Sequence, residues 1–304
     1  MFYFNKINIY LPVVMITLAF GVIGMCWPDI LQKIQYPLSG ILVVLIGLPH
    51  GATDFLLFRR LYGPELSQKK VFKFFLFYLA AIFGYLILWL LLPVVAMITF
   101  LVISAYHFGQ SNCQTLPFTS NIRPLMNISF GAFTIGGAVL WHWDEGQNIV
   151  QQMIGSLPAC SDLTMANIQW FILLFNVVIF FITRIIGQID TTMLIHEVVK
   201  LCVLSFMFYF TPLLVGFSLY FALWHSLSSL FDQILFFRLK WPSFTLTNYY
   251  YQAAPYTLLA ILGLLGLMFG QSVLFPETSF ISLFLILIAC VTLPHIILVE
   301  ERYK

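Results

Sequence analysis

Ten long apolar segments occupy most of the 304-residue chain and decide what it can fold into. A helix needs about 20 apolar residues to cross a bilayer, and each segment is long enough to do so. The segments are Tyr10–Trp27, Pro37–Phe58, Val71–Leu91, Pro93–Asn112, Pro124–Trp143, Ala166–Ile186, Thr192–Phe210, Pro212–Asp232, Pro255–Phe275 and Ser279–Val299. The chain is therefore predicted to be an all-α polytopic bundle of about ten transmembrane helices, forming a single integral membrane domain over residues 1–304.

The composition excludes a soluble fold. Only 9% of the residues are charged and 61% are hydrophobic, whereas soluble domains carry roughly a quarter charged residues. A soluble enzyme is therefore excluded, and the lipid bilayer is the expected surrounding. The net charge of +2 is too small to attract polyanions, so no nucleic-acid partner is expected.

The basic residues predict the orientation of the chain. With the N-terminus in the cytoplasm, all of the 14 lysine and arginine residues except Lys33 and Lys200 fall in cytoplasmic segments. This asymmetry is the one that the positive-inside rule requires. Both termini are thus predicted to be cytoplasmic, and we expect a multi-pass protein of a bacterial-type inner (plasma) membrane.

Four histidines are predicted to lie at one depth in the bilayer. His50, His107, His225 and His295 fall in the second, fourth, eighth and tenth segments. Counted from the cytoplasmic helix ends at 1.5 Å per residue, their depths differ by only about 6 Å. An intramembrane histidine is costly and by default a functional residue. Four imidazoles without thiolates suit iron, zinc, copper or nickel, although each ring could instead be hydrogen-bonded to a neighbouring helix.

The other two histidines fit this layer less well. His142 lies near the outer end of the fifth segment and is interpreted as an interfacial anchor. His196 begins the seventh segment, where it could cap the helix or support a metal ligand.

Polar and aromatic neighbours accompany the four histidines. Asp54 follows His50 by four residues, one turn along the helix, and could orient an imidazole on its own helix or across the bundle. The alternative partners of this carboxylate are Arg59 and Arg60. Further polar neighbours are Asn112 and Ser229, and the aromatic residues that would line such a site are Tyr106, Phe108, Trp224 and Phe55.

Four short motifs carry a resemblance to a known family. Residues 47–54 read Gly-Leu-Pro-His-Gly-Ala-Thr-Asp, residues 104–110 read Ser-Ala-Tyr-His-Phe-Gly-Gln, residues 220–226 read Tyr-Phe-Ala-Leu-Trp-His-Ser, and residues 293–295 read Leu-Pro-His. In this order, each on a predicted span, they resemble the motifs of the Brp/Blh family of membrane β-carotene 15,15′-dioxygenases (bacteriorhodopsin-related-protein-like). The similarity covers most of the chain from the second segment onward.

This resemblance implies an oxidoreductase that cleaves β-carotene, or a related carotenoid, with O2 at the central 15,15′ double bond to give retinal. It implies a non-haem Fe(II) cofactor, a carotenoid substrate drawn from the lipid phase, and retinal that could supply a rhodopsin. His50, His107 and His225 match the motif positions and would be catalytic, and together with His295 they would bind the metal. The residues that would support these ligands are Asp54, Ser229, Asn112 and His196.

Two departures from the family pattern leave a second hypothesis open. Family members commonly carry a second histidine in His-Ser-x-x-His where this chain has Ser229, and an acidic residue where it has Asn112. The alternative is a non-catalytic membrane protein that binds a carotenoid or retinal and has an altered metal site. A lipid hydroxylase or desaturase is disfavoured because no two histidines are closer than 29 residues. A transporter is disfavoured because no internal repeat is evident.

Overall fold

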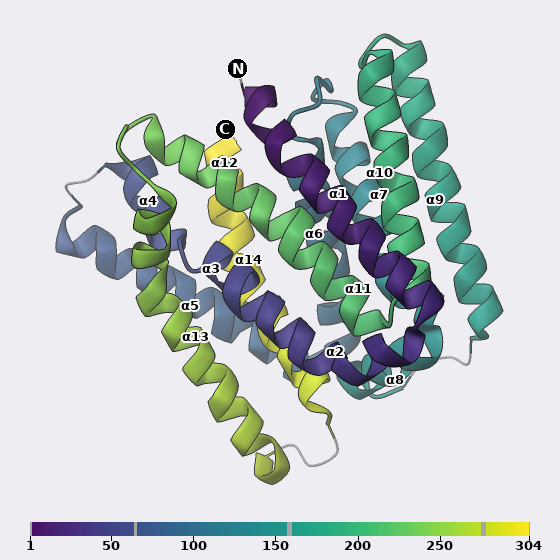
Figure 1. Cartoon of the computed structure of the whole chain (residues 1–304). Coiled ribbons are helices and arrows are strands. Elements are labelled where there is room, and N and C mark those ends of the chain that lie inside the picture. Colours follow the sequence, from purple (N-terminus) through teal and green to yellow (C-terminus); the bar gives the residue numbers. More distant parts are fainter. Residues whose placement is uncertain (1, 64–65, 157–159, 275–277, 304) are drawn as a thin grey trace. The chain divides into compact units, whose positions relative to one another are not determined.

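The computed structural model of the chain describes residues 2–63, 66–156, 160–274 and 278–303 (Figure 1). Within these ranges the chain forms helices and no strand. The all-α class is thereby confirmed. Phe275, where the ninth segment was predicted to end, lies outside the described residues.

Ten of the described helical runs are long and apolar enough to cross a membrane, as expected of a multi-pass membrane protein. They are Ile9–Cys26, Pro28–Tyr62, Gln68–Leu91, Pro93–Cys113, Arg123–Ile154, Asp162–Ile185, Thr191–Phe210, Leu213–Arg238, Leu246–Gln271 and Phe280–Arg302. The second run begins at Pro28, nine residues before the predicted start, because proline is well accommodated in the first turn of a helix. The cytoplasmic placement of the termini stays a prediction.

The chain divides into two compact units, and the division cuts through helices. Unit 1 comprises Met1–Val43, Ser104–Gln147 and Pro158–Ser228, and unit 2 comprises Val44–Ile103, Asn148–Leu157 and Ser229–Lys304. Four of the breaks, after Val43, Ile103, Gln147 and Ser228, fall inside helical runs. The single membrane domain predicted for the whole chain stays a prediction.

The helices of unit 1 pack against one another along several shared faces. Its elements are α1 (Phe2–Cys26), α2 (Pro28–Leu42), the second half of α6 (Pro93–Cys113), α7 (Arg123–Val139), η2 (Leu140–His142), the start of α8 (Trp143–Ile154), α9 (Asp162–Ile185), α10 (Thr191–Phe210), α11 (Leu213–Leu219) and the π-helical η3 (Tyr220–Ser226). The helix α1 packs along α10, α2 packs along α11, and α7 contacts both α9 and α10. Figure 1 shows α9 and α10 side by side at the edge of this unit.

Small residues and buried amides hold the helices of unit 1 together. A Cβ atom on Gly109 of α6 would meet the backbone carbonyl of Asn127 of α7, so these two backbones approach closely. On α9, Asn176 accepts a hydrogen bond of 2.9 Å from the Ser129 hydroxyl and donates one of 3.0 Å to the Ser129 carbonyl. The position of α6, which carries His107, is therefore set by backbone packing against α7.

Unit 2 packs its helices around α14. Its elements are most of the π-helical η1 (Val43–Gly47), α3 (Leu48–Gly51), α4 (Asp54–Tyr62), α5 (Gln68–Leu91), the first half of α6, most of α12 (Leu227–Arg238), α13 (Leu246–Leu274) and α14 (Phe280–Tyr303). The helix α14 contacts α4, α5 and α13, and α13 also contacts the short α3. A buried cluster that includes Leu57, Leu230, Phe237 and Tyr249 forms one core of the unit.

Candidate metal centre

Two of the candidate histidines lie at irregular helix segments. The π-helical η1 ends at Gly47, three residues before His50, and the π-helical η3 contains His225. Single π-helical turns of this kind occur often at functional sites, because the extra residue redirects the side chains of the turn. The run that carries His50 is interrupted again at Thr53, where α3 has ended and α4 begins.

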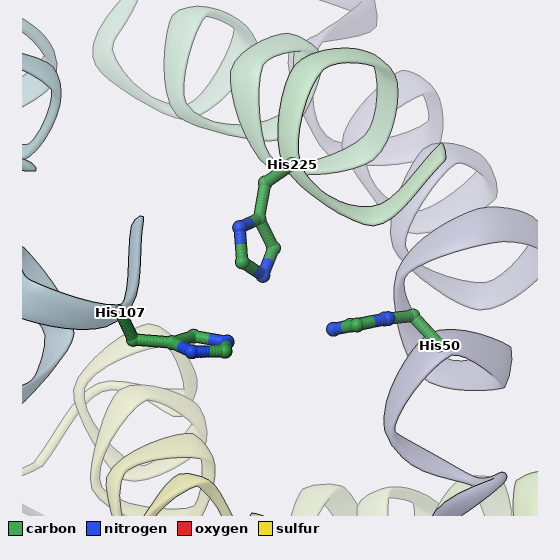
Figure 2. Close-up of side chains that lie close together, drawn as sticks. All are labelled: His50, His107 and His225. Carbon is green, nitrogen blue, oxygen red and sulfur yellow. The ribbon is translucent and has the colours of Figure 1, made fainter. Parts of the chain in front are cut away.

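In unit 1, the structure brings His107 of α6 and His225 of η3 together. Their ring centroids are 4.9 Å apart at an interplanar angle of 70°. Both rings are buried, with 4% and 2% of the residue exposed. Figure 2 shows the two imidazoles projecting from their separate helices toward each other.

Aromatic rings surround His225. The Phe108 ring centroid lies 4.7 Å from that of His225, and the Phe221 ring stacks on His225 at 5.8 Å with an interplanar angle of 14°. Phe108, one of the predicted lining residues, therefore contacts a candidate ligand. Tyr106 is half-buried on the same helix.

Two other predicted lining residues have their own packing partners. Trp224 donates a hydrogen bond of 2.9 Å from its indole N–H to the Thr17 hydroxyl on α1. Phe55 packs its ring against Phe74 and Phe75 of α5 in the core of unit 2.

In unit 2, the structure pairs His50 of α3 with His295 of α14. Their ring centroids are 4.9 Å apart at an interplanar angle of 80°, and both rings are buried. Oδ1 of Asp54 lies 2.7 Å from Nδ1 of His295, and Oδ2 accepts a hydrogen bond of 2.8 Å from the Tyr78 hydroxyl. The sequence left several partners open for Asp54. In the structure, Asp54 contacts an imidazole on another helix, that of His295.

The Asp54 contact decides which nitrogen of His295 could bind a metal. An ionised carboxylate only accepts hydrogen bonds, so Nδ1 of His295 carries the proton in this contact. The lone pair of the ring is then on Nε2, as in the carboxylate–histidine–metal arrangements of metalloproteins. Asp54 acts here through His295, and Tyr78 fixes the second oxygen of the carboxylate.

The remaining predicted support residues lie in other surroundings. Asn112 belongs to a buried network on α6 and α10, where Lys200 donates hydrogen bonds of 2.7 Å to the Asn112 amide oxygen and the Glu197 carboxylate. Asn112 also donates one of 3.2 Å to Glu197. The His196 ring lies 6.0 Å from that of Tyr10.

Ser229 and His142 also have defined places. Ser229 is half-buried on α12, one turn after His225. The Nε2 atom of His142 lies 2.7 Å from the carbonyl oxygen of Phe208, near the end of α10. That contact gives His142 a hydrogen-bonding partner in unit 1, and its interpretation as an interfacial anchor stays a prediction.

Several residues around the histidines carried no signal in the sequence. Tyr78 lies 24 positions from Asp54, to which its hydroxyl donates a hydrogen bond. The side-chain amide of Gln233 lies 3.5 Å from Nδ1 of His50, although the two residues are 183 positions apart. Tyr249 is 196 positions from Thr53, and the two hydroxyl oxygens are 3.3 Å apart. Tyr78, Gln233 and Tyr249 do not belong to a motif that contains a histidine, so only tertiary contacts could identify these three residues.

The donor set fits a first-row transition metal. Each unit supplies two buried imidazoles, and unit 2 adds a carboxylate that orients one of them. Neutral imidazole nitrogens bind iron, zinc, copper and nickel, and hydrogen bonds to their far nitrogens raise the basicity of the ligand. The residues present can therefore hold the kind of cation that the sequence predicted.

Comparisons with known proteins place this arrangement in a family. A family model described as β-carotene 15,15′-dioxygenase matches residues 41–301, a range that contains all four histidines and Asp54. A β-carotene 15,15′-dioxygenase of an uncultured marine bacterium 66A03 is 29% identical over 191 residues, which cover 61% of this chain and 64% of that protein. The chain thus spans less than two thirds of that relative's length, and no solved structure matches it. Because the family match extends over most of the chain and over every candidate ligand, the chain belongs to the β-carotene 15,15′-dioxygenase family.

Proposed function

We propose that the protein is a membrane dioxygenase that cleaves β-carotene, or a related carotenoid, at the central 15,15′ double bond. One O2 is consumed, the carbon–carbon double bond breaks, and each carbon takes one oxygen atom, which gives two molecules of retinal. The observation that carries this proposal is the presence of two buried histidine pairs, one in each unit, at the positions of the family motifs.

His50, His107 and His225 together hold one metal ion in this proposal, with His295 as the fourth candidate ligand. We take the ion to be iron(II), a cation that imidazole ligands suit. When bound, iron(II) supplies the one-electron chemistry that O2 needs in order to react with a polyene.

Chain connectivity places three of the four histidines near points where the chain passes from one unit to the other. His225 lies three residues before Ser228, His107 three residues after Ser104, and His50 six residues after Val44, and at each of these points a helical run passes from one unit to the other. At 1.5 Å per residue these separations correspond to about 5–9 Å along a helix. Three of the four histidines therefore belong to the short helix stretches that connect the two units.

The residues of the chain bind, orient and exclude water in this reaction. Asp54 holds the His295 ring, and burial of all four imidazoles keeps bulk water from them. Phe108 and Phe221 give the His225 ring an apolar surrounding suited to a hydrocarbon polyene. The cleavage transfers no net proton, so the proposed mechanism requires neither a protein acid nor a base.

The substrate and product are both soluble in the bilayer. A carotenoid that partitions into lipid can enter a helical bundle sideways, between apolar helix faces. We propose that the chain works in a bacterial-type plasma membrane, and that the retinal leaves into the same bilayer, where a rhodopsin could take it up.

The second candidate is a carotenoid- or retinal-binding protein without catalysis. The observation in its favour is Ser229, which stands one turn after His225 where family members commonly carry a second histidine. A hydroxyl is a poor replacement for an imidazole ligand. This candidate predicts purified protein that binds a carotenoid or retinal and carries no stoichiometric metal.

One experiment separates the two candidates. The chain is expressed in cells that make β-carotene, and colour loss, retinal by chromatography and metal content of the purified protein are measured. We expect cleavage and one iron per chain for the wild type, and loss of both for His50→Ala, His107→Ala and His225→Ala with insertion retained. Unchanged retinal and iron in these variants, or persistent colour with abundant inserted wild type, would overturn the dioxygenase proposal.

A further inference from the structure

The side chains around Nδ1 of His50 form a buried hydrogen-bonding group whose central member, Gln233, lies outside the family motifs. The amide nitrogen Nε2 of Gln233, on α12, lies 3.5 Å from Nδ1 of His50. Gln233 is almost completely buried, with 1% of the residue exposed. This amide is therefore a polar group that unit 2 places against the Nδ1 side of the His50 ring.

Two hydroxyl groups hold the other end of the Gln233 amide. Its oxygen Oε1 lies 2.6 Å from the Thr53 hydroxyl and 3.3 Å from the Tyr249 hydroxyl. The same hydroxyls reach backbone carbonyls beside the candidate ligand: Thr53 lies 3.1 Å from the carbonyl oxygen of His50, and Tyr249 lies 3.4 Å from that of Pro49. The amide, the ring and the backbone of His50 thus belong to one network.

The network has two self-consistent arrangements of its protons. In the first, both hydroxyls donate to Oε1, the Gln233 NH2 group donates to Nδ1, and the proton of the neutral imidazole is on Nε2. In the second, the amide is turned by 180°, its NH2 group donates to both hydroxyl oxygens, and these donate to the carbonyls of His50 and Pro49. The oxygen of Gln233 then accepts a hydrogen bond from Nδ1–H of His50.

Only the second arrangement prepares His50 to bind a metal through Nε2. A neutral imidazole has a single nitrogen lone pair, and the proton on Nδ1 leaves that lone pair on Nε2. Asp54 imposes the same tautomer on His295, because a carboxylate can only accept a hydrogen bond. The two histidines of unit 2 are then both held at Nδ1 by a side chain from a neighbouring element.

We propose that Gln233 is a positioning residue for His50, which accepts a hydrogen bond from Nδ1–H and so fixes the tautomer whose Nε2 binds the metal. This inference rests on the proposed function, because it assumes that His50 is a metal ligand. It adds a residue that acts on the ligand from outside the motif, with Thr53 and Tyr249 holding the amide in its accepting orientation.

Two substitutions of Gln233 test the inference. Gln233→Met keeps the length of the side chain and removes every hydrogen bond to the ring, whereas Gln233→Glu keeps an acceptor. The matched control is Gln169→Met, which removes another buried amide, one that donates to the Phe133 carbonyl in unit 1. Each purified protein is freed of metal and titrated without oxygen with Co(II), whose visible absorption reports ligand binding independently of carotenoid cleavage.

We expect Gln233→Met to weaken Co(II) binding about 10- to 100-fold, the usual cost of losing a group that orients a ligand histidine. Gln233→Glu should bind Co(II) at least as tightly as the wild type, because a carboxylate accepts the Nδ1–H hydrogen bond more strongly than an amide does. Gln169→Met should leave the Co(II) affinity unchanged.

The possible failures are distinguishable. Wild-type Co(II) affinity in Gln233→Met overturns the inference, and so does a Gln233→Glu variant that inserts normally but binds as weakly as Gln233→Met. If Gln233→Met does not accumulate in the membrane, the Co(II) affinity of Gln233→Glu decides alone. If His50→Gln binds Co(II) as tightly as the wild type, or if the wild type binds none, the proposed metal site itself fails and the inference fails with it.

Discussion

Nδ1 of His295 lies 2.7 Å from Oδ1 of Asp54, although the two residues are 241 positions apart in the chain. The contact joins the Asp54 motif of the second membrane helix to the last helix of the chain, and Tyr78 completes it from α5. A buried carboxylate that holds an imidazole in this way is costly unless both groups are paired, and here each has its partner.

The Asp54 carboxylate should control metal binding through His295. Asp54→Asn removes its charge and should lower metal affinity about 10- to 100-fold. Tyr78→Phe should have a smaller effect, because the carboxylate keeps its contact with His295. The control is Tyr85→Phe. It removes another hydroxyl of α5, which donates a hydrogen bond to the Ala96 carbonyl. Metal titration of the wild type and the three variants tests this order of affinities. The prediction is contradicted if Tyr85→Phe weakens metal binding as much as Asp54→Asn does.

Removing one partner of the buried ion pair between Lys200 and Glu197 should be strongly destabilising. Lys200→Met leaves the Glu197 carboxylate buried without its cation and should cost about 3–5 kcal/mol of unfolding free energy. Adding Glu197→Gln should restore part of this loss, because no unpaired charge then remains. Denaturation in detergent measures the unfolding free energies of the single and the double variant. The control is Lys73→Met, at an exposed position of α5, which should change the unfolding free energy little. A double variant less stable than Lys200→Met would contradict the prediction.

Close packing of α6 on α7 should be required for the position of His107. Gly109→Ala places a Cβ against the backbone carbonyl of Asn127, where nothing flexible can yield, and should cost about 1–3 kcal/mol. Gly84→Ala is the matched control, because a Cβ there meets nothing within 4 Å. That substitution should stabilise α5 by up to about 1 kcal/mol through helix propensity. Equal thermal midpoints for the two variants would argue against close packing at Gly109.

His142, one of the two histidines outside the two pairs, should not affect metal binding. His142→Gln should keep the metal content of the wild type, because Nε2 of His142 contacts the Phe208 carbonyl and a glutamine amide can donate to the same atom. His225→Gln should lose the metal. Elemental analysis of the two purified variants compares them, and equal iron contents would show that His225 is not a ligand.

Much of the fold could be predicted from the sequence because span length is a local property. Ten apolar runs give ten membrane-length helices, and the prolines at positions 93 and 212 separate neighbouring runs as expected. The start of the second helix was wrong by nine residues, because Pro28 opens a helix that hydropathy alone does not include. Polarity patterns locate the apolar part of a helix better than its first turn.

The sequence by itself determined the membrane fold, the family and the four histidines, because each depends on residue type and on spacing along one helix. The tertiary structure decided which partners those histidines have. Asp54 could have paired with Arg59 or Arg60, and it holds His295 instead. Gln233 reaches His50 only because α12 packs beside α3. A sequence pattern encodes which face of a helix a side chain occupies, and the side chain that it meets is set by packing between helices far apart in the chain.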